Sequence, residues 1–234
     1  MTKELFREDS YIKQCAAQVI AQDGNKVALD QTVFYPMGGG QPGDKGVLVR
    51  HDGERVDIQD TIKDRDSGQI WHVIDEGLEF EQGERISAVL DWERRYSLMR
   101  LHSCMHMLCA VVPAPVTGGS IRDDGTARLD FDLPEPPDKA ELNGKLNALT
   151  TASHVMRLNW ITDKELQAQP DLVRTMSVQP PMGAGTVRLV EFADVDLQPC
   201  GGTHVANSNE IGAVAIQSIK KKGKQNRRIT IALA

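Results

Sequence analysis

The segment RRYSLMRLHSCMHMLCAV, residues 94–111, decides the fold prediction for this chain. We interpret it as a helix, with Asp91 as its N-terminal cap. Four residues turn through ~400° in a helix, so His102 and His106 emerge from the same face, about one turn apart. Both imidazole rings can therefore bind a single metal ion.

A second motif, Cys200-Gly201-Gly202-Thr203-His204, follows roughly ninety residues later. Its glycine pair predicts a turn rather than a helix. The motif supplies a thiolate and a third imidazole. Either motif alone is a weak signal, because such spacings occur by chance. Together they make a tetrahedral nitrogen and sulfur donor set, which suits Zn²⁺ better than Mg²⁺ or Ca²⁺. The predicted zinc ligands are His102, His106, Cys200 and His204.

The residues before this helix carry a different pattern. Between residues 14 and 91, glycine-containing turn signals alternate with short β-leaning runs, and no long helical period interrupts them. This pattern favours a small β-barrel. We therefore predict an α+β protein of two domains. Residues 1–91 form a β-barrel domain with a Gly-rich loop, and residues 92–234 form an α+β domain whose sheet packs around the metal-bearing helix.

Composition narrows the cellular context. The chain has 234 residues, a net charge of −6 and four cysteines, too few for a disulfide framework. Its charged N-terminus does not match a signal peptide, and no run approaches the ~20 apolar residues of a membrane span. We expect a cytoplasmic protein with no membrane partner, as a monomer or a weak homodimer.

A basic run near the C-terminus stands out against the negative net charge. It contains no acidic residue and consists of Lys220, Lys221, Lys222, Lys224, Arg227 and Arg228. The run is either the solvated tip of a hairpin or a local contact for RNA phosphates, which act at short range at cellular salt.

The two His/Cys motifs resemble the editing domain shared by alanyl- and threonyl-tRNA synthetases. Further segments resemble the alanyl branch: residues 30–36 and 38–44, Gly119-Ser120-Ile121, residues 128–132, Val187-Arg188, Glu191 and Glu210-Ile211-Gly212. Free-standing proteins of this kind form the AlaX family of alanyl-tRNA editing proteins, and the Gly-rich N-terminal motif is similar to the medium-length type.

The resemblance implies a trans-editing hydrolase that uses Zn²⁺ to deacylate tRNA(Ala) mischarged with serine or glycine. It implies that the substrate contacts Gly39, Gly40, Gln41, Thr117 and Ser120. The residues expected to contact tRNA are Lys220, Lys222, Lys224, Arg227 and Arg228. No side chain is assigned as the catalytic group. In the synthetases a Thr commonly precedes the second His, where this chain has Met105.

Several alternatives stay open at this point. The zinc ion either activates water or only shapes the pocket, because four protein ligands usually mark a structural site. A zinc-stabilised RNA-binding module without turnover fits the same residues, and so does a metallohydrolase of small esters. Peptidase chemistry is disfavoured, since no Glu stands next to the His pair as it does in HExxH metalloproteases.

Overall fold

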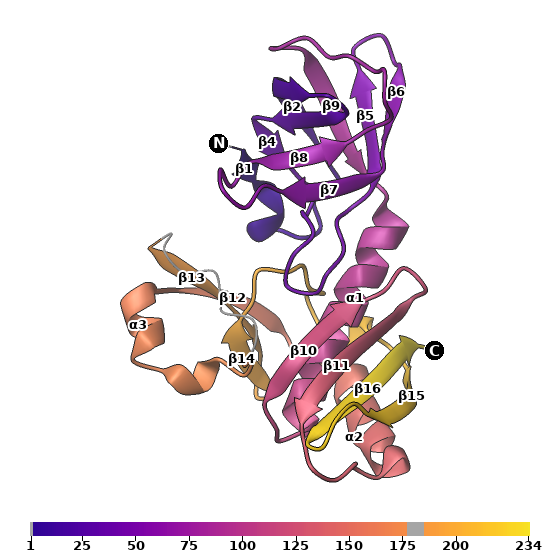
Figure 1. The fold of residues 1–234 in the computed structure, drawn as a ribbon, viewed down its shortest axis with the longest axis vertical. Helices are drawn as coiled ribbons and strands as arrows, with labels where there is room; N and C mark the ends of the chain where they lie inside the picture. Colours follow the sequence, from indigo (N-terminus) through magenta and orange to yellow (C-terminus); the bar gives the residue numbers. More distant parts are fainter. Residues whose placement is uncertain (1, 177–184) are drawn as a thin grey trace. The chain divides into compact units, whose positions relative to one another are not determined.

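A computed structural model of the chain describes residues 2–176 and 185–234 (Figure 1). Its contacts divide the chain into two compact units, Met1–Leu98 and Met99–Ala234. The division falls inside helix α1 (Trp92–Val111). The boundary predicted at residue 91 stays a prediction. The loop expected at Pro180-Pro181 lies outside the described residues.

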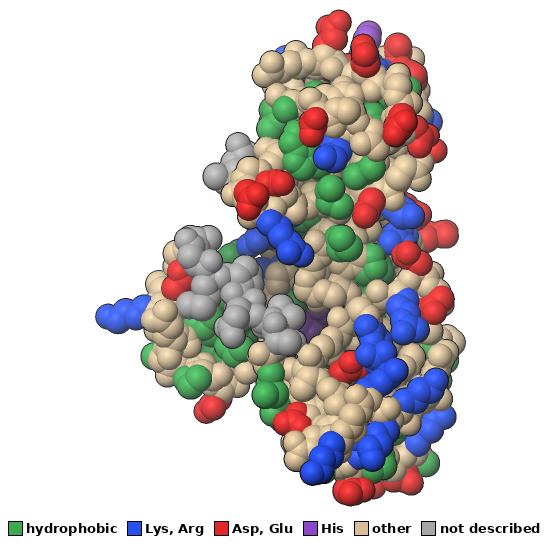
Figure 2. All heavy atoms as spheres, viewed as in Figure 1, with side chains coloured by type: hydrophobic (Ala, Val, Ile, Leu, Met, Phe, Trp, Pro, Cys, Tyr) green, Lys and Arg blue, Asp and Glu red, His purple; other side chains and the backbone are tan. Residues whose placement is uncertain are grey.

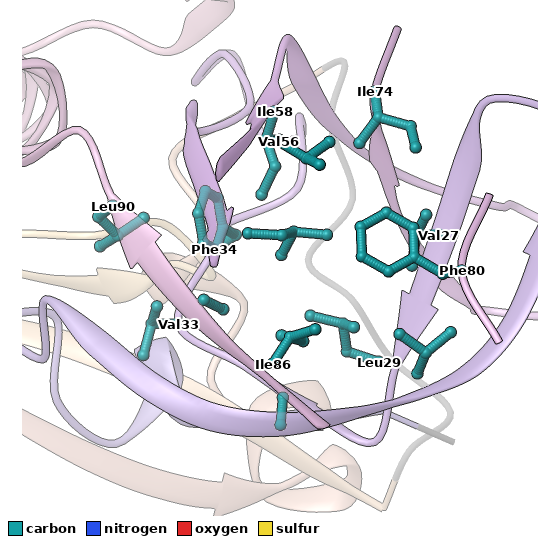
Figure 3. Packing of buried hydrophobic residues seen from close by; sticks show 14 residues of the cluster. Val27, Leu29, Val33, Phe34, Val56, Ile58, Ile74, Phe80, Ile86 and Leu90 are labelled. Carbon is teal, nitrogen blue, oxygen red and sulfur yellow. The ribbon is translucent and has the colours of Figure 1, made fainter. Parts of the chain in front are cut away.

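The first unit consists mainly of strands. Its elements before α1 are β1 (Lys3–Glu4), η1 (Leu5–Arg7), β2 (Gln14–Asp23), β3 (Lys26–Leu29), β4 (Gln31–Thr32), β5 (Gly46–Arg50), β6 (Arg55–Ile58), β7 (Asp60–Lys63), β8 (Ile70–Val73) and β9 (Arg85–Leu90). Seven strands form one sheet in the order β6-β5-β9-β2-β3-β8-β7, and β1 pairs with β4 in parallel. The seven-stranded sheet encloses an aliphatic core with two phenylalanines, Phe34 and Phe80 (Figure 3).

The curvature of this sheet comes from β2. Residues 14–18 of β2 pair with β9, residues 19–23 pair with β3, and a register shift separates Val19 from Ala21. A bulge of this kind bends a strand and increases its twist. The edge strands β6 and β7 are joined by Gln59, whose N–H donates to the carbonyl of Val73 (2.8 Å). Among the described residues no ladder joins β6 to β7, so the sheet is open and the predicted barrel is not confirmed.

The Gly-rich loop between β4 and β5 is an ordered turn. Gly38 and Gln41 exchange two backbone hydrogen bonds (3.1 and 2.9 Å), while Gly39 and Gly40 have φ of 55° and 82°. Two successive positive φ angles favour glycine in such a two-residue turn. At Gly43 a β-carbon would lie 2.3 Å from the backbone carbonyl oxygen of Thr61, so only glycine fits there.

A buried ion pair fixes the base of this loop. Asp44 is 1 % exposed and Arg95, in the first turns of α1, is fully buried. The Arg95 Nε donates to both carboxylate oxygens of Asp44 (3.0 and 2.9 Å), and its other nitrogens donate to the carbonyls of Ser10 (3.0 Å) and Val33 (2.6 Å). Asp44 also accepts from the N–H of Tyr35 (2.6 Å). Both oxygens of the Asp44 carboxylate thus accept hydrogen bonds, as a buried charge requires.

His72 on β8 is fully buried. Its Nδ1 lies 3.0 Å from the carbonyl of Val27 and must donate, which leaves Nε2 to accept from the Thr32 hydroxyl (2.8 Å). The Thr32 oxygen accepts in turn from the N–H of Phe34 (3.0 Å). The network is complete with a neutral imidazole. Burial lowers the pKa of His72 from 6.5 to about 4.

Acid should therefore destabilise the first unit. Below pH 6.5 His72 is protonated in the unfolded chain, whereas in the folded protein it stays neutral down to about pH 4. The free energy of unfolding therefore falls as the pH drops through this window. The full contribution is about 3 kcal/mol. His72→Gln should flatten the pH dependence of urea unfolding between these pH values relative to the original protein. Parallel profiles for the two proteins would contradict the role of His72.

The second unit contains two sheets. Its elements are β10 (Val116–Ile121), β11 (Thr126–Asp132), α2 (Lys139–Thr151), β12 (Met156–Thr162), α3 (Asp163–Gln167), η2 (Pro170–Leu172), β13 (Thr186–Phe192), β14 (Asp196–Pro199), η3 (Ser208–Glu210), β15 (Val214–Lys221) and β16 (Asn226–Leu233). One sheet has the order β10-β11-β16-β15, and the other has the order β12-β13-β14. The mixed α+β class predicted for the chain is confirmed.

The four-stranded sheet turns one face towards α1. At Gly119 on β10, a β-carbon would lie 3.1 Å from the Met105 methyl group of α1. The same side of the sheet carries buried apolar residues of β11 and β16, including Leu129 and Ile229. The opposite face is polar. No helix in the part of the chain that the structure describes is long and apolar enough to cross a membrane.

Candidate metal centre

Helix α1 presents two buried imidazoles from one face. The Asp91 carboxylate accepts from the N–H of Arg94 (3.1 Å), which confirms the predicted cap. His102 and His106 are 5 % and 4 % exposed, and their ring centroids lie 5.7 Å apart. The helical spacing thus places both rings where one ion can meet them.

The loop that follows β14 brings the other two groups to these rings. Arg188 on β13 is buried and donates to the carbonyls of Gly201 (3.2 Å) and Gly202 (2.9 Å). The N–H of Cys200 donates to the Arg188 carbonyl (3.1 Å), so both ends of this short segment are held by one residue. These hydrogen bonds restrain the Gly201-Gly202 segment.

Four potential ligand atoms, from His102, His106, Cys200 and His204, lie within 4.8 Å of one another. The Cys200 Sγ is 3.6 Å from His102 Nε2 and 3.3 Å from His204 Nε2. Tetrahedral zinc with bonds of about 2.0 Å to nitrogen and 2.3 Å to sulfur requires ligand separations of about 3.3–3.6 Å. The donor types and these spacings fit a zinc ion.

Residues outside the cluster orient two of its imidazoles. The His106 Nδ1 donates to the Asp196 carboxylate (2.8 Å), which also accepts from the Gln198 amide (2.7 Å). The His204 Nδ1 lies 3.2 Å from the Ser103 hydroxyl, which accepts from the N–H of Val205 (3.1 Å). Each contact occupies Nδ1 and leaves Nε2 for an ion, an arrangement that protein metal sites commonly use. The sequence-based prediction did not include Asp196, Gln198 or a role for Ser103.

The electrostatics of the cluster favour metal binding. Burial by itself would raise the pKa of the Cys200 thiol, but His102 and His204 hold that pKa well below its usual value. Burial also lowers the pKa of His204. For His106, burial opposes protonation, but the hydrogen bond to Asp196 and the proximity of Cys200 raise the pKa to about 9. A metal ion must therefore displace a proton from His106 at neutral pH.

Metal affinity should depend on pH through this proton. Below about pH 9 the apparent affinity should rise about tenfold per pH unit, because binding releases one proton from His106. Asp196→Asn should flatten this dependence above the ordinary histidine pKa of 6.5 and lower the limiting affinity about 10- to 100-fold. Competition with a chelator across this pH range measures both effects. An unchanged pH profile in the variant would show that Asp196 does not control the protonation of His106.

The residues predicted to contact substrate belong to two elements, the Gly-rich turn and β10. Gly39, Gly40 and Gln41 belong to the turn of the first unit. On β10, the Thr117 hydroxyl donates to the carbonyl of Asp130 (3.2 Å), and the Ser120 hydroxyl accepts from Arg128 (2.8 Å). Gly119 faces α1, and side chains alternate along a strand, so Ser120 lies on the opposite face of the sheet.

The basic run forms the end of the β15–β16 hairpin. Figure 2 shows Lys and Arg side chains gathered over the four-stranded sheet that contains this hairpin. Lys220, Lys222 and Lys224 are exposed. Arg228 forms two hydrogen bonds with the Asp130 carboxylate (both 2.7 Å). Arg227, in contrast, is 6 % exposed and donates to the carbonyls of Gly223, Asn226 and Pro134. The lysines are therefore the accessible cations of this hairpin.

Comparison with known proteins assigns the chain to a family. A model described as the threonyl and alanyl tRNA synthetase second additional domain matches residues 187–230, and one described as tRNA synthetases class II (A) matches residues 5–94. Alanyl-tRNA editing protein AlaX-M of Saccharolobus solfataricus is 34% identical over 233 residues, which are 98% of each chain. The chain belongs to the AlaX-M family. The family predicted from the two motifs is confirmed.

Other relatives show how the AlaX-M sequence relates to larger enzymes. AlaX-M of Methanosarcina barkeri is 36% identical over 247 residues, covering 100% of this chain and 99% of that protein. The alanine–tRNA ligase of Sulfurisphaera tokodaii is 30% identical over 234 residues, which are 94% of this chain but only 25% of the ligase. The AlaX-M chain thus corresponds to a section of the ligase.

Proposed function

We propose that this AlaX-M protein is a trans-editing aminoacyl-tRNA deacylase that hydrolyses tRNA(Ala) mischarged with serine or glycine at a zinc site. The observation that carries the proposal is the buried cluster of His102, His106, Cys200 and His204, found in a chain whose full-length relatives are named alanyl-tRNA editing proteins. The reaction cleaves the ester between the amino acid and the terminal ribose of the tRNA.

The residues of the chain have distinct parts in this proposal. His102, His106, Cys200 and His204 hold the zinc ion, which when bound supplies a Lewis acid and lowers the pKa of water. Asp196 and Ser103 fix the direction of two of the imidazoles, and Arg188 fixes the loop that carries Cys200. Preorganised groups of this kind suit hydrolysis of an activated ester, which mainly requires a positioned water and a polarised carbonyl.

The decisive experiment is deacylation of Ser-, Gly- and Ala-tRNA(Ala) by the purified protein. We expect fast turnover of the serine ester, slower turnover of the glycine ester, which also lacks the hydroxyl, and no turnover of the alanine ester. A site that pairs with the serine hydroxyl rejects alanine, because its polar groups would otherwise be left unpaired. Equal rates on the three tRNAs would indicate an unselective esterase and would contradict the proposed specificity.

One observation favours a second function, a zinc-stabilised RNA-binding module without turnover. The cluster offers four protein ligands, and a zinc shell closed by protein is typically structural. This alternative predicts that the protein binds tRNA(Ala) tightly and leaves all three esters intact. The deacylation assay therefore separates the two functions directly.

We further propose that the lysines of the β15–β16 hairpin contact the tRNA backbone. Lys222→Ala with Lys224→Ala should weaken tRNA binding and reduce the slope of log K against log salt by about two units, one for each phosphate that is no longer neutralised. The matched control is Lys145→Ala with Lys164→Ala, which removes two positive charges from helices α2 and α3. If both double variants change the slope equally, only net charge matters and the hairpin has no specific role.

A further inference from the structure

Trp160 on β12 is the one aromatic residue among the exposed large hydrophobic side chains of the described residues, with 47% of its surface accessible. Tryptophan is usually well buried, because its large apolar surface gains most from leaving water. An indole left open to solvent on a well-defined strand is therefore a candidate contact surface.

The strand register places Trp160 on the sheet face that supports the metal cluster. Trp160 lies directly opposite Arg188 in the β12–β13 ladder, and paired residues share a face of the sheet. Arg188 holds the carbonyls of the Gly201-Gly202 turn beside Cys200.

The neighbouring rows of the same face reach the imidazoles themselves. Phe192 pairs with Asp196, and Val190 pairs with Gln198, so Asp196 and Gln198 share the face of Trp160 and Arg188. These two polar residues contact His106. Successive rows of one face are about 7 Å apart. Trp160 lies one row from Gln198 and two rows from Asp196, with strand β13 between them.

We propose that Trp160 is the stacking surface for the adenine base at the 3′ end of the tRNA. This inference rests on the proposed function. The ester to be cleaved is carried by the terminal ribose, and the base is attached to that same sugar. When the ester lies at the His/Cys cluster, the adenine must lie within one sugar ring of it. Trp160 is an exposed aromatic residue on the sheet face that supports this cluster. Nucleobases can stack on exposed aromatic side chains without forming specific hydrogen bonds.

The kinetic test compares substrates with and without the base. Trp160→Ala should lower kcat/KM about tenfold on Ser-tRNA(Ala) and on 3′-O-seryl-adenosine, mainly through KM, while hydrolysis of serine methyl ester stays unchanged. Trp160→Phe, which keeps an aromatic ring, should recover most of the loss. Asn159→Ala is the matched control, because Asn159 is the next residue on the strand and points to the opposite face.

A binding test gives an answer that does not depend on turnover. The substitutions Trp71→Phe and Trp92→Phe leave Trp160 as the sole indole of the chain. Adenosine 5′-monophosphate should quench its fluorescence, whereas ribose 5-phosphate, which lacks the base, should not.

The outcomes separate this inference from the proposed function. If no seryl ester is hydrolysed, the proposed function fails, and the fluorescence titration alone decides the role of Trp160. If Trp160→Ala slows all three substrates equally, or if the nucleotide causes no more quenching than the sugar phosphate, the stacking role is wrong while deacylation stands.

Discussion

Alanine in place of His102 or of His106 should leave the protein folded, deprive it of zinc and reduce deacylation of Ser-tRNA(Ala) at least ~100-fold. Each imidazole provides one of four potential ligand atoms that lie within 4.8 Å of one another, so removing one leaves an ion with only three protein ligands. Loss of a residue that merely orients a ligand already costs about 10- to 100-fold in affinity or activity, and loss of a ligand should cost no less.

The measurement is zinc content by elemental analysis, with the deacylation rate and circular dichroism on the same samples. The original protein should contain about one zinc per chain. His51→Ala is the matched control, since His51 is an exposed histidine in the turn after β5 and contributes no atom to the cluster. If both cluster variants retain full zinc and full activity, the assignment of these residues as ligands is wrong.

Breaking the buried ion pair at the base of the Gly-rich loop should have the largest effect on stability. Arg95→Met leaves the Asp44 carboxylate buried and without its main partner, which should reduce the free energy of unfolding by about 3–5 kcal/mol. An exposed pair of the same unit, Lys26 with Asp23 (3.6 Å), is the control, and Lys26→Met should change stability by less than about 1 kcal/mol.

A double substitution distinguishes uncompensated charge from lost packing. Adding Asp44→Asn to Arg95→Met removes the buried negative charge while keeping an oxygen that can accept from the N–H of Tyr35. The double variant should therefore be more stable than Arg95→Met alone, which urea unfolding of the variants can measure. If the effects of the two single variants simply add, charge compensation does not explain the cost of the first.

Sequence patterns predicted the local structure well where short-range rules operate. The period of an α-helix alone indicated that His102 and His106 share a face, and the Asp91 cap was confirmed by its hydrogen bond to Arg94. The hairpin of β10 and β11 follows from the turn residues between them, including Gly125 with φ of 77°. These features depend on residues within a few positions of one another.

The same patterns could not show which side of a strand would be buried. Ser120 was predicted to contact substrate, which stays a prediction; the pleat of β10 turns Gly119 towards α1 and places Ser120 on the other face. Arg227 was predicted to contact tRNA, whereas the structure shows it nearly buried against backbone carbonyls. A shift of one residue in strand register would exchange these faces, and register is set by distant strands.

The sequence by itself determined the helix with its histidine pair, the Cys/His turn and the family to which they point. Only the tertiary structure decided that β13 and β14 bring Asp196 against His106, that Arg188 holds the turn beside Cys200, and that the seven-stranded sheet of the first unit stays open. The first group follows from the preferences of neighbouring residues. The second depends on pairing between strands far apart in the chain. There the free energy gained from burial and hydrogen bonding must exceed the entropic cost of closing long loops.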